Sequence, residues 1–175
     1  MPGRTMELAT PPASASLDPR EFRRALGSFA TGVTIITTTR AGGEPVGLTA
    51  NSFSSVSLDP PLVLWSLSLR SPSLQAFEEA GHFAVNVLAE DQVEVSRRFS
   101  TPIPDKFDGV KWHRGIASLP LIDGTVSRLE CQVTARHVSG DHVIFIGQVQ
   151  RFAYESRAPL VFCQGRYMCA SQLQE

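Results

Sequence analysis

The chain has 175 residues, of which 42% are hydrophobic, and this fits one globular domain with a real core. Its formal net charge is −1 and no block of basic residues stands out, so we expect neither nucleic acid nor a membrane surface as a partner. No run of about 18 apolar residues is present, and we therefore expect no membrane-spanning helix.

The number and spacing of the cysteines indicate the cellular compartment in which the protein works. Cys131, Cys163 and Cys169 form no CxxC pair and no Cys/His cluster with zinc spacing. An odd and sparse set argues against a secreted disulfide framework. We expect buried free thiols, a cytoplasmic location and no metal site.

The N-terminal residues differ in composition from the rest of the chain. Residues 1–16 are rich in Pro, Ala, Ser and Thr and lack the apolar core of a signal peptide. We expect residues 1–17 to be a disordered or extended tail without chemistry, and residues 18–175 to form a single domain.

A first helix is predicted to start after Asp18. Asp18 is a typical N-cap, Pro19 suits the first helical position, and Glu21 is placed to close a capping box. Gly32 is expected to stop the helix. Four apolar residues lie between them at helical spacing, namely Phe22, Ala25, Leu26 and Phe29.

Most of the remaining chain is predicted to form short strands. The run 33–39 is almost wholly β-branched, which favours an extended strand. Residues 129–136 alternate between apolar and polar, whereas 143–146 are apolar on both faces, so their outer face also needs cover. Further strands are expected at 45–49, 52–57, 62–69, 82–88 and 162–170. Helices are expected at 72–80, capped by Ser71, and at 91–99, followed by an irregular loop over 100–114.

This arrangement indicates a fold that is mainly β with a few helices. Strands do not alternate regularly with helices, so a parallel doubly wound sheet is not expected. An antiparallel barrel is the natural closure for many short strands because it leaves no open edges.

Common catalytic motifs are missing from the sequence. There is no GxGxxG after a strand, no P-loop, no GxSxG and no HExxH. If the protein is an enzyme, its chemistry is expected to come largely from a bound cofactor.

Three polar segments are candidates for a binding site. The first is dense in small hydroxyl and amide side chains that suit the edge of a planar ligand: Thr49, Ala50, Asn51, Ser52, Phe53, Ser54, Ser55 and Ser57. The alternative is a solvated strand pair with a polar turn. The second segment carries Ser68, Arg70 and Ser71 before a helix start, and it indicates either an anion site or a simple helix cap.

The third segment is Gly140–His142, which is expected to form a hairpin turn. A neutral His142 beside Asp141 could donate to a carboxamide or line a nicotinamide pocket. The alternative is a histidine with no role beyond the turn.

Together the segments resemble a known family. The strings FRRALGSFATGVTIITT, GLTANSFSSVSLDPPLVLWSL, FAVNVL and GDHVIFIGQV occur in this order, between Asp18 and about Ala170. They resemble the short-chain NAD(P)H:flavin reductases, which are the reductase components of two-component flavin-dependent monooxygenases. The T-x-N-S-F-x-S-x-S-x-x-P-P string and G-D-H are specific in combination.

The resemblance implies a split antiparallel β-barrel of the FMN-binding type that forms a homodimer. It implies FMN or FAD held by the Thr49–Ser57 segment, with the phosphate near Ser68, Arg70 and Ser71. Phe83 and Asn86 would lie near the flavin pocket, and Asp141 and a catalytic His142 would face the nicotinamide.

The implied reaction is hydride transfer from C4 of NADH or NADPH to N5 of the flavin, and the acceptor of the reduced flavin would be a monooxygenase. Direct transfer needs close stacking rather than a strong general base. Two alternatives remain, a split-barrel oxidase like the pyridoxamine-phosphate oxidases and a non-enzymatic flavin- or haem-binding barrel. NADH consumption with added flavin separates all three.

Overall fold

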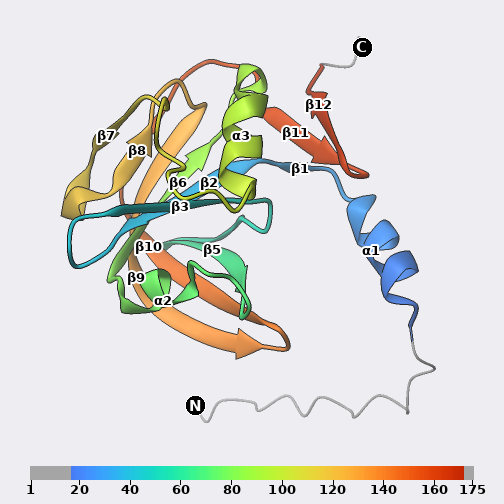
Figure 1. Cartoon of the computed structure of the whole chain (residues 1–175), viewed down its shortest axis with the longest axis horizontal. Coiled ribbons are helices and arrows are strands. Elements are labelled where there is room, and N and C mark those ends of the chain that lie inside the picture. The colour runs from blue at the N-terminus through green and yellow to red at the C-terminus, as the bar shows by residue number, and fades with distance from the viewer. Residues whose placement is uncertain (1–16, 172–175) are drawn as a thin grey trace.

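The structure, a computed structural model, describes residues 17–171 and is built around one large antiparallel sheet (Figure 1). Seven strands follow the order β3-β2-β6-β9-β10-β5-β4. Their bounds are β2 Thr34–Thr39, β3 Pro45–Ala50, β4 Ser54–Leu58, β5 Pro61–Ser68, β6 His82–Val87, β9 Ser127–Ser139 and β10 His142–Tyr154. All the pairings between them are antiparallel, which confirms the predicted mainly β, antiparallel class.

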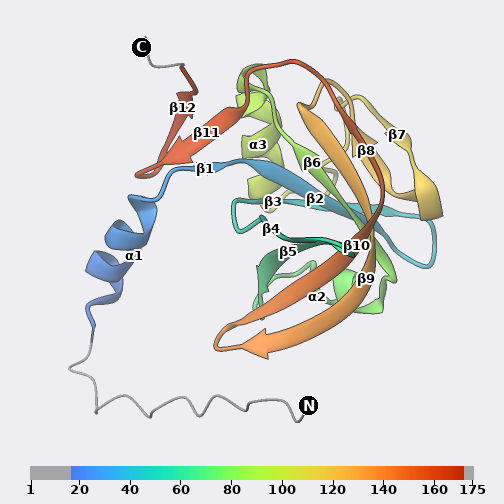
Figure 2. The ribbon, with the colours of Figure 1, turned by 180° about the vertical axis from the view of Figure 1, so that it is seen from behind.

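Two smaller sheets and a few helices complete the described part of the chain. The smaller sheets are β1 (Thr31–Gly32) with β11 (Leu160–Cys163) and β12 (Arg166–Cys169), and β7 (Trp112–Arg114) with β8 (Pro120–Ile122). The helices are α1 Pro19–Gly27, α2 Leu74–Glu79, η1 Glu90–Gln92, α3 Val93–Ser100 and η2 Ile116–Ser118. Helix α1 stands apart from the main sheet, beside β11 and β12, in Figure 1 and in the reverse view of Figure 2.

Strand β2 is buried although four of its six residues are threonines. The threonine hydroxyls are satisfied by backbone carbonyls, because Thr37 donates to Pro120 at 2.5 Å and Thr38 donates to His82 at 2.8 Å. β-Branching favours the strand, and these bonds remove the cost of burying the hydroxyls. The predicted strand at 33–39 is therefore confirmed.

Aromatic packing fixes the orientation of β5 and β10. The Trp65 ring stacks on Phe145 with centroids 4.8 Å apart, and Phe77 meets it edge-on at 4.9 Å. All three side chains are buried, with exposed fractions of 0–1%. Because side chains alternate along a strand, the neighbours of Trp65 and Phe145 point to the opposite face of the sheet.

The first helix differs in detail from its prediction. Asp18 caps it by accepting from the Arg20 backbone N–H at 2.8 Å, as expected. Glu21 does not close a capping box, because its carboxylate pairs with Arg24 at 3.0 Å. The helix ends at Gly27, so Phe29 and Gly32 lie beyond it, and Gly32 belongs to a strand rather than to a helix stop.

Three further predictions differ from the structure. Helix α2 begins at Leu74 with Ser73 as its N-cap, since the Ser71 hydroxyl accepts from Ser73 N–H within the preceding turn. The single strand predicted over 162–170 is a hairpin, because Gln164 and Gly165 take positive φ values of 50° and 75° and reverse the chain. The loop predicted over 100–114 ends in strand β7.

The three cysteines are free, and only Cys131 is buried as expected. Burial, with a smaller contribution from the charge of Glu130, raises the pKa of the Cys131 thiol to about 12. Cys163 is half-buried and Cys169 is exposed, so the expectation of buried thiols is wrong for Cys169. Within residues 17–171 no helix is long and apolar enough to cross a membrane. The expected tail lies almost wholly outside the described residues, and the single domain over 18–175 stays a prediction.

Candidate functional site

The β9–β10 hairpin brings two of the candidate segments together. Gly140 takes a φ of 60°, which permits the tight turn between Ser139 and His142. In the register of β10 with β5, His142 lies opposite Ser68. The Leu69 backbone N–H also donates to the Asp141 carbonyl at 2.9 Å. The turn that carries Arg70 therefore lies against the hairpin tip.

Asp141 orients the His142 ring. The Nδ1 atom of His142 lies 2.8 Å from Oδ1 of Asp141. The hydrogen bond and charge of His142, with a smaller effect of Arg70, hold the pKa of Asp141 below its usual value. A carboxylate only accepts, so the Nδ1 atom carries the hydrogen. A neutral His142 in this tautomer presents Nε2 as an acceptor, and its contact with a nicotinamide stays a prediction.

One face of the main sheet collects most of the sequence-predicted groups. Paired residues of antiparallel strands point to the same face, and this face is opposite to Trp65 and Phe145. We call it the outer face and define it by the side chains of Leu62, Leu64, Ser66, Ser68, His142, Ile144, Ile146 and Gln148. All eight are half-buried. Ser54 and Ser57 of β4 extend the outer face, because they lie opposite Leu64 and Leu62.

The outer face has an apolar floor between two polar ends. Its floor consists of Leu62, Leu64, Ile144 and Ile146. Ser68 and His142 lie at one end, beside Arg70 and Asp141, and Gln148 lies at the other end. The serines of β4 lie along one side. An apolar floor with a few convergent polar groups is typical of ligand sites.

The Thr49–Ser57 segment divides into anchored and exposed residues. The Thr49 hydroxyl donates to the Ser96 carbonyl at 2.6 Å, and the Ser52 hydroxyl bonds both the carbonyl and the N–H of Ser66 at 3.0 Å. These two side chains therefore hold the backbone in place. Ala50 and Phe53 are half-buried, whereas Asn51, Ser54 and Ser55 are exposed. Ser54 belongs to the outer face, but Ser55 is opposite the buried Val63 and points to the other face of the sheet.

Phe83 and Asn86 do not join this set. Both are 0% exposed. Phe83 packs against Trp65 with centroids 5.9 Å apart. The Asn86 amide donates to the Ile35 carbonyl at 3.0 Å and accepts from the Ile122 N–H at 2.8 Å. Their side chains contact the core, and the expectation that these residues lie near the flavin pocket stays a prediction.

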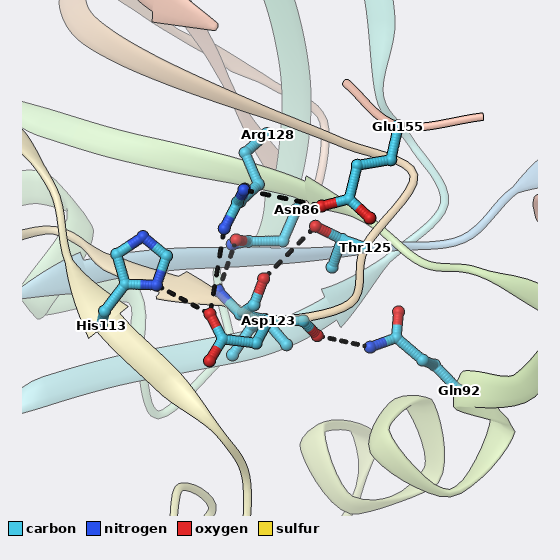
Figure 3. Close-up of polar contacts among 8 residues, drawn as sticks. Asn86, Gln92, His113, Asp123, Thr125, Arg128 and Glu155 are labelled. Atoms are coloured by element: carbon cyan, nitrogen blue, oxygen red, sulfur yellow. Dashed lines mark hydrogen bonds and ion pairs between the residues drawn. The ribbon is translucent and has the colours of Figure 1, made fainter. Parts of the chain in front are cut away.

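A polar network that the sequence did not reveal joins β7, β8, β9 and η1 (Figure 3). His113 Nδ1 lies 2.7 Å from Asp123 Oδ1, and Arg128 lies between Asp123 at 3.9 Å and Glu155 at 4.0 Å. Gln92 donates to the Asp123 carbonyl at 2.8 Å. These residues come from separate segments, so their spacing in the sequence does not indicate that they are in contact. Their contacts attach the β7–β8 hairpin to the main sheet.

No group of three or more His, Cys, Asp or Glu side chains among residues 17–171 is arranged to hold a metal ion. The candidate site is formed by hydroxyl, amide, imidazole and guanidinium groups around an apolar floor.

The model of the flavin reductase-like domain family matches residues 26–171 of the chain. The NADH-dependent FMN reductase SmoA of Agrobacterium fabrum is 49% identical over 148 residues, covering 85% of this chain and 84% of that protein. The monooxygenase reductase subunit HsaB of Mycobacterium tuberculosis is 44% identical, covering 88% and 83%. The chain covers only 48% of another relative, a probable flavin reductase of Rhizobium meliloti.

A solved structure of an oxidoreductase also matches this chain in fold and sequence. The NADH:FAD oxidoreductase SgcE6 of Streptomyces globisporus, in complex with NAD and FAD fragments, is 39% identical, with a TM-score of 0.83. The match covers 90% of this chain and 98% of that one. Fold, site and similarity thus define an oxidoreductase that works with flavin. The chain belongs to the flavin reductase-like family, as its sequence motifs predicted.

Proposed function

We propose that this protein reduces FMN or FAD with NADH or NADPH and releases the reduced flavin to a separate monooxygenase. The observation that carries the proposal is the outer face, where the segments proposed to bind flavin and nicotinamide meet at the paired positions Ser68 and His142. The similarity to NADH-dependent flavin reductases supports it.

The described residues fit a flavin. Its ring system is planar and partly apolar, and the half-exposed floor of Leu62, Leu64, Ile144 and Ile146 suits one side of it. Exposed Asn51 and Ser54 offer an amide and a hydroxyl to the polar ring edge. Arg70, with the serines of its turn, suits the phosphate. When bound, the flavin supplies the hydride acceptor, N5.

His142 is proposed to orient the nicotinamide. Because Asp141 holds its Nδ1–H, the neutral ring directs the acceptor Nε2 away from the carboxylate. A carboxamide N–H₂ group is a matching donor. This role is one of positioning, which agrees with a reaction that needs close approach and no strong base.

The main sheet is proposed to close into the split barrel that the family resemblance implies. Its two edge strands, β3 and β4, are consecutive in the chain and only residues 51–53 separate them. This short link holds the two edges of the sheet near each other. The buried aromatic cluster between β5, β6 and β10 would then be the barrel interior.

A homodimer is proposed to complete the site. The apolar floor of the outer face is half-exposed, and a second copy would cover the part that the flavin leaves open. Helix α1 presents another uncovered apolar surface, since Phe22 is 52% and Leu26 is 59% exposed and no residue of the helix is buried. Uncovered apolar surface of this kind is typical of protein interfaces.

Free cysteines at Cys131, Cys163 and Cys169 fit the reducing cytoplasm proposed for the protein. The monooxygenase partner is supported by HsaB and by the reductase component of the trigonelline monooxygenase of Acinetobacter baylyi, which is 45% identical.

Steady-state NADH oxidation tests the function directly. The purified protein should consume NADH or NADPH only when FMN or FAD is added, and the rate should saturate with flavin concentration. A protein that binds flavin but consumes no dinucleotide would be a non-enzymatic flavin-binding protein. Oxidation of an amine substrate without dinucleotide would identify an oxidase instead.

A further inference from the structure

Two hydrogen bonds connect the C-terminal hairpin to the segment proposed to bind flavin. The Thr49 hydroxyl in β3 donates to the backbone carbonyl of Ser96 at 2.6 Å. The Ser96 hydroxyl in α3 lies 2.9 Å from the hydroxyl of Tyr167 in β12. Ser96 is fully buried. One residue of α3 thus bonds β3 through its carbonyl and β12 through its side chain.

The Tyr167 ring is held firmly, so its hydroxyl has a defined direction. Phe162, which lies opposite Tyr167 in the β11–β12 register, packs edge-on at a centroid distance of 5.4 Å. The guanidinium of Arg97 lies 5.8 Å from the centre of the ring. The backbone of the hairpin turn is itself tied to α1, because Gln164 N–H donates to the Gly27 carbonyl at 2.8 Å.

Helix α3 and strand β3 are in close contact, so a displacement of the helix reaches the strand. A Cβ atom placed on Gly47 would lie 2.6 Å from the Phe99 ring, which leaves no space for a side chain there. Close-packed interiors transmit such displacements. Three residues after Thr49, the Ser52 hydroxyl is fixed to the backbone of Ser66. The short stretch between Thr49 and Ser52 is therefore held at both ends.

We propose that Tyr167 is a positioning residue for the flavin-binding segment, acting through Ser96 on Thr49. This inference rests on the proposed function. Tyr167 fixes α3, α3 fixes Thr49, and Thr49 with Ser52 sets the backbone that presents Asn51 to the ligand. No direct contact between Tyr167 and flavin is involved.

Removal of the Tyr167 hydroxyl leaves the buried Ser96 hydroxyl without this partner. A serine in a helix then turns to a carbonyl one turn earlier, which bends the helix. The Ser96 carbonyl moves with the helix, and its bond to Thr49 weakens. We expect the segment around Asn51 to become more mobile before any flavin binds.

The chain offers a matched pair of variants, because Tyr154 and Tyr167 are its two tyrosines. Tyr154 is 79% exposed at the end of β10, so Tyr154→Phe is the control for Tyr167→Phe. We would measure amide hydrogen exchange of the flavin-free protein, the dissociation constants of FMN and FAD, and kcat at saturating flavin.

Tyr167→Phe should speed exchange over residues 47–53 while leaving β6 as in the parent. Its flavin dissociation constant should rise about threefold to tenfold, the effect of one hydrogen bond, with kcat nearly unchanged. Tyr154→Phe should match the parent in all three measurements. Parent-like exchange and affinity in Tyr167→Phe would overturn the inference, and so would faster exchange spread equally over β6.

A second variant separates positioning from a general loss of stability. Ser96→Ala removes the same hydrogen bond but keeps the carbonyl that Thr49 uses, so it should act like Tyr167→Phe. The double variant should be no weaker than either single one, and additive effects would contradict the connection. A parent protein that binds no flavin would overturn the proposed function as well. Normal binding by the parent and both variants would overturn only this inference.

Discussion

At the residue scale, the pairing of His142 with Asp141 decides what the imidazole can do. Asp141 accepts at 2.8 Å, which leaves Nε2 of a neutral His142 available to a ligand donor. Both side chains are substantially exposed, 45% for His142 and 88% for Asp141, so they are accessible to a substrate. Solvent screens such an exposed pair, and we therefore assign it an orienting role rather than a role in stability.

His142→Ala tests this role. The loss of one hydrogen bond should cost on the order of 1–2 kcal/mol, seen as a roughly tenfold higher KM for NADH or slower flavin reduction. Flavin affinity should stay constant. Stopped-flow reduction across NADH concentrations measures both parameters. His82→Ala is the control, because His82 lies at the start of β6, which β9 separates from β10. Equal kinetics in His142→Ala and the parent would show that His142 has no role beyond the hairpin turn.

Arg70 is the cation proposed to meet the flavin phosphate. Arg70→Ala should weaken flavin binding by on the order of 1–3 kcal/mol through the loss of a charge-assisted hydrogen bond. The unfolding midpoint should be nearly unchanged, since the side chain is exposed. Arg40→Ala at the β2–β3 turn, where Arg40 pairs with Glu44, is the matched control. An unaltered dissociation constant in a flavin titration would remove Arg70 from the site.

At the element scale, β10 fits its neighbours because it carries glycine at one buried position. A Cβ on Gly147 would lie 2.5 Å from the Phe83 ring and 3.0 Å from Cys131 Cβ. Phe83 is completely buried and has no space to move. This contact explains the core role of Phe83, and it lies where the β9–β10 register shifts between Ile146 and Gly147.

Gly147→Ala should therefore lower the free energy of unfolding by about 1–3 kcal/mol, as expected for overpacking. Gly81→Ala is the control, because a Cβ there meets no atom within 4 Å and its φ is not positive. Chemical denaturation of the two variants and the parent measures the difference. Equal stability of all three would show that β10 does not pack on Phe83 as described.

At the scale of the whole molecule, association is the main expectation. The parent should have twice the 19.0 kDa mass of the chain by light scattering at micromolar concentration. Leu26→Asp places a charge on the exposed apolar side of α1 and should shift the protein toward the monomer. A monomeric parent would contradict the proposed homodimer. A Leu26→Asp protein that stays dimeric would show that the interface does not include this side of α1.

The sequence predicted much of the fold because local patterns determine single elements. The β-branched run at 33–39 and the turn at Gly140 have physical causes within a few residues, and both were predicted correctly. The split of 162–170 into β11 and β12 was missed, because it depends on a positive φ at Gln164 that no strong sequence signal marks.

The candidate site was predictable in its segments but not in its geometry. The hydroxyl-rich string and the G-D-H turn were found in the sequence, yet only the register that pairs His142 with Ser68 brings them together. The hydrogen bonds of Asn86 were not predictable, because they run to Ile35 and Ile122 in distant segments. Long-range pairing of this kind leaves no trace in local spacing.

Mapping the flavin contacts tests the central claim most directly. In a titration of the labelled protein with FMN, followed by backbone NMR, the largest shift changes should fall on residues 49–55 and 68–71. Later addition of NAD⁺ should shift residues 140–142. Flavin-dependent changes centred on the His113–Asp123 network, with residues 49–55 and 68–71 unaffected, would contradict the site proposed on the outer face.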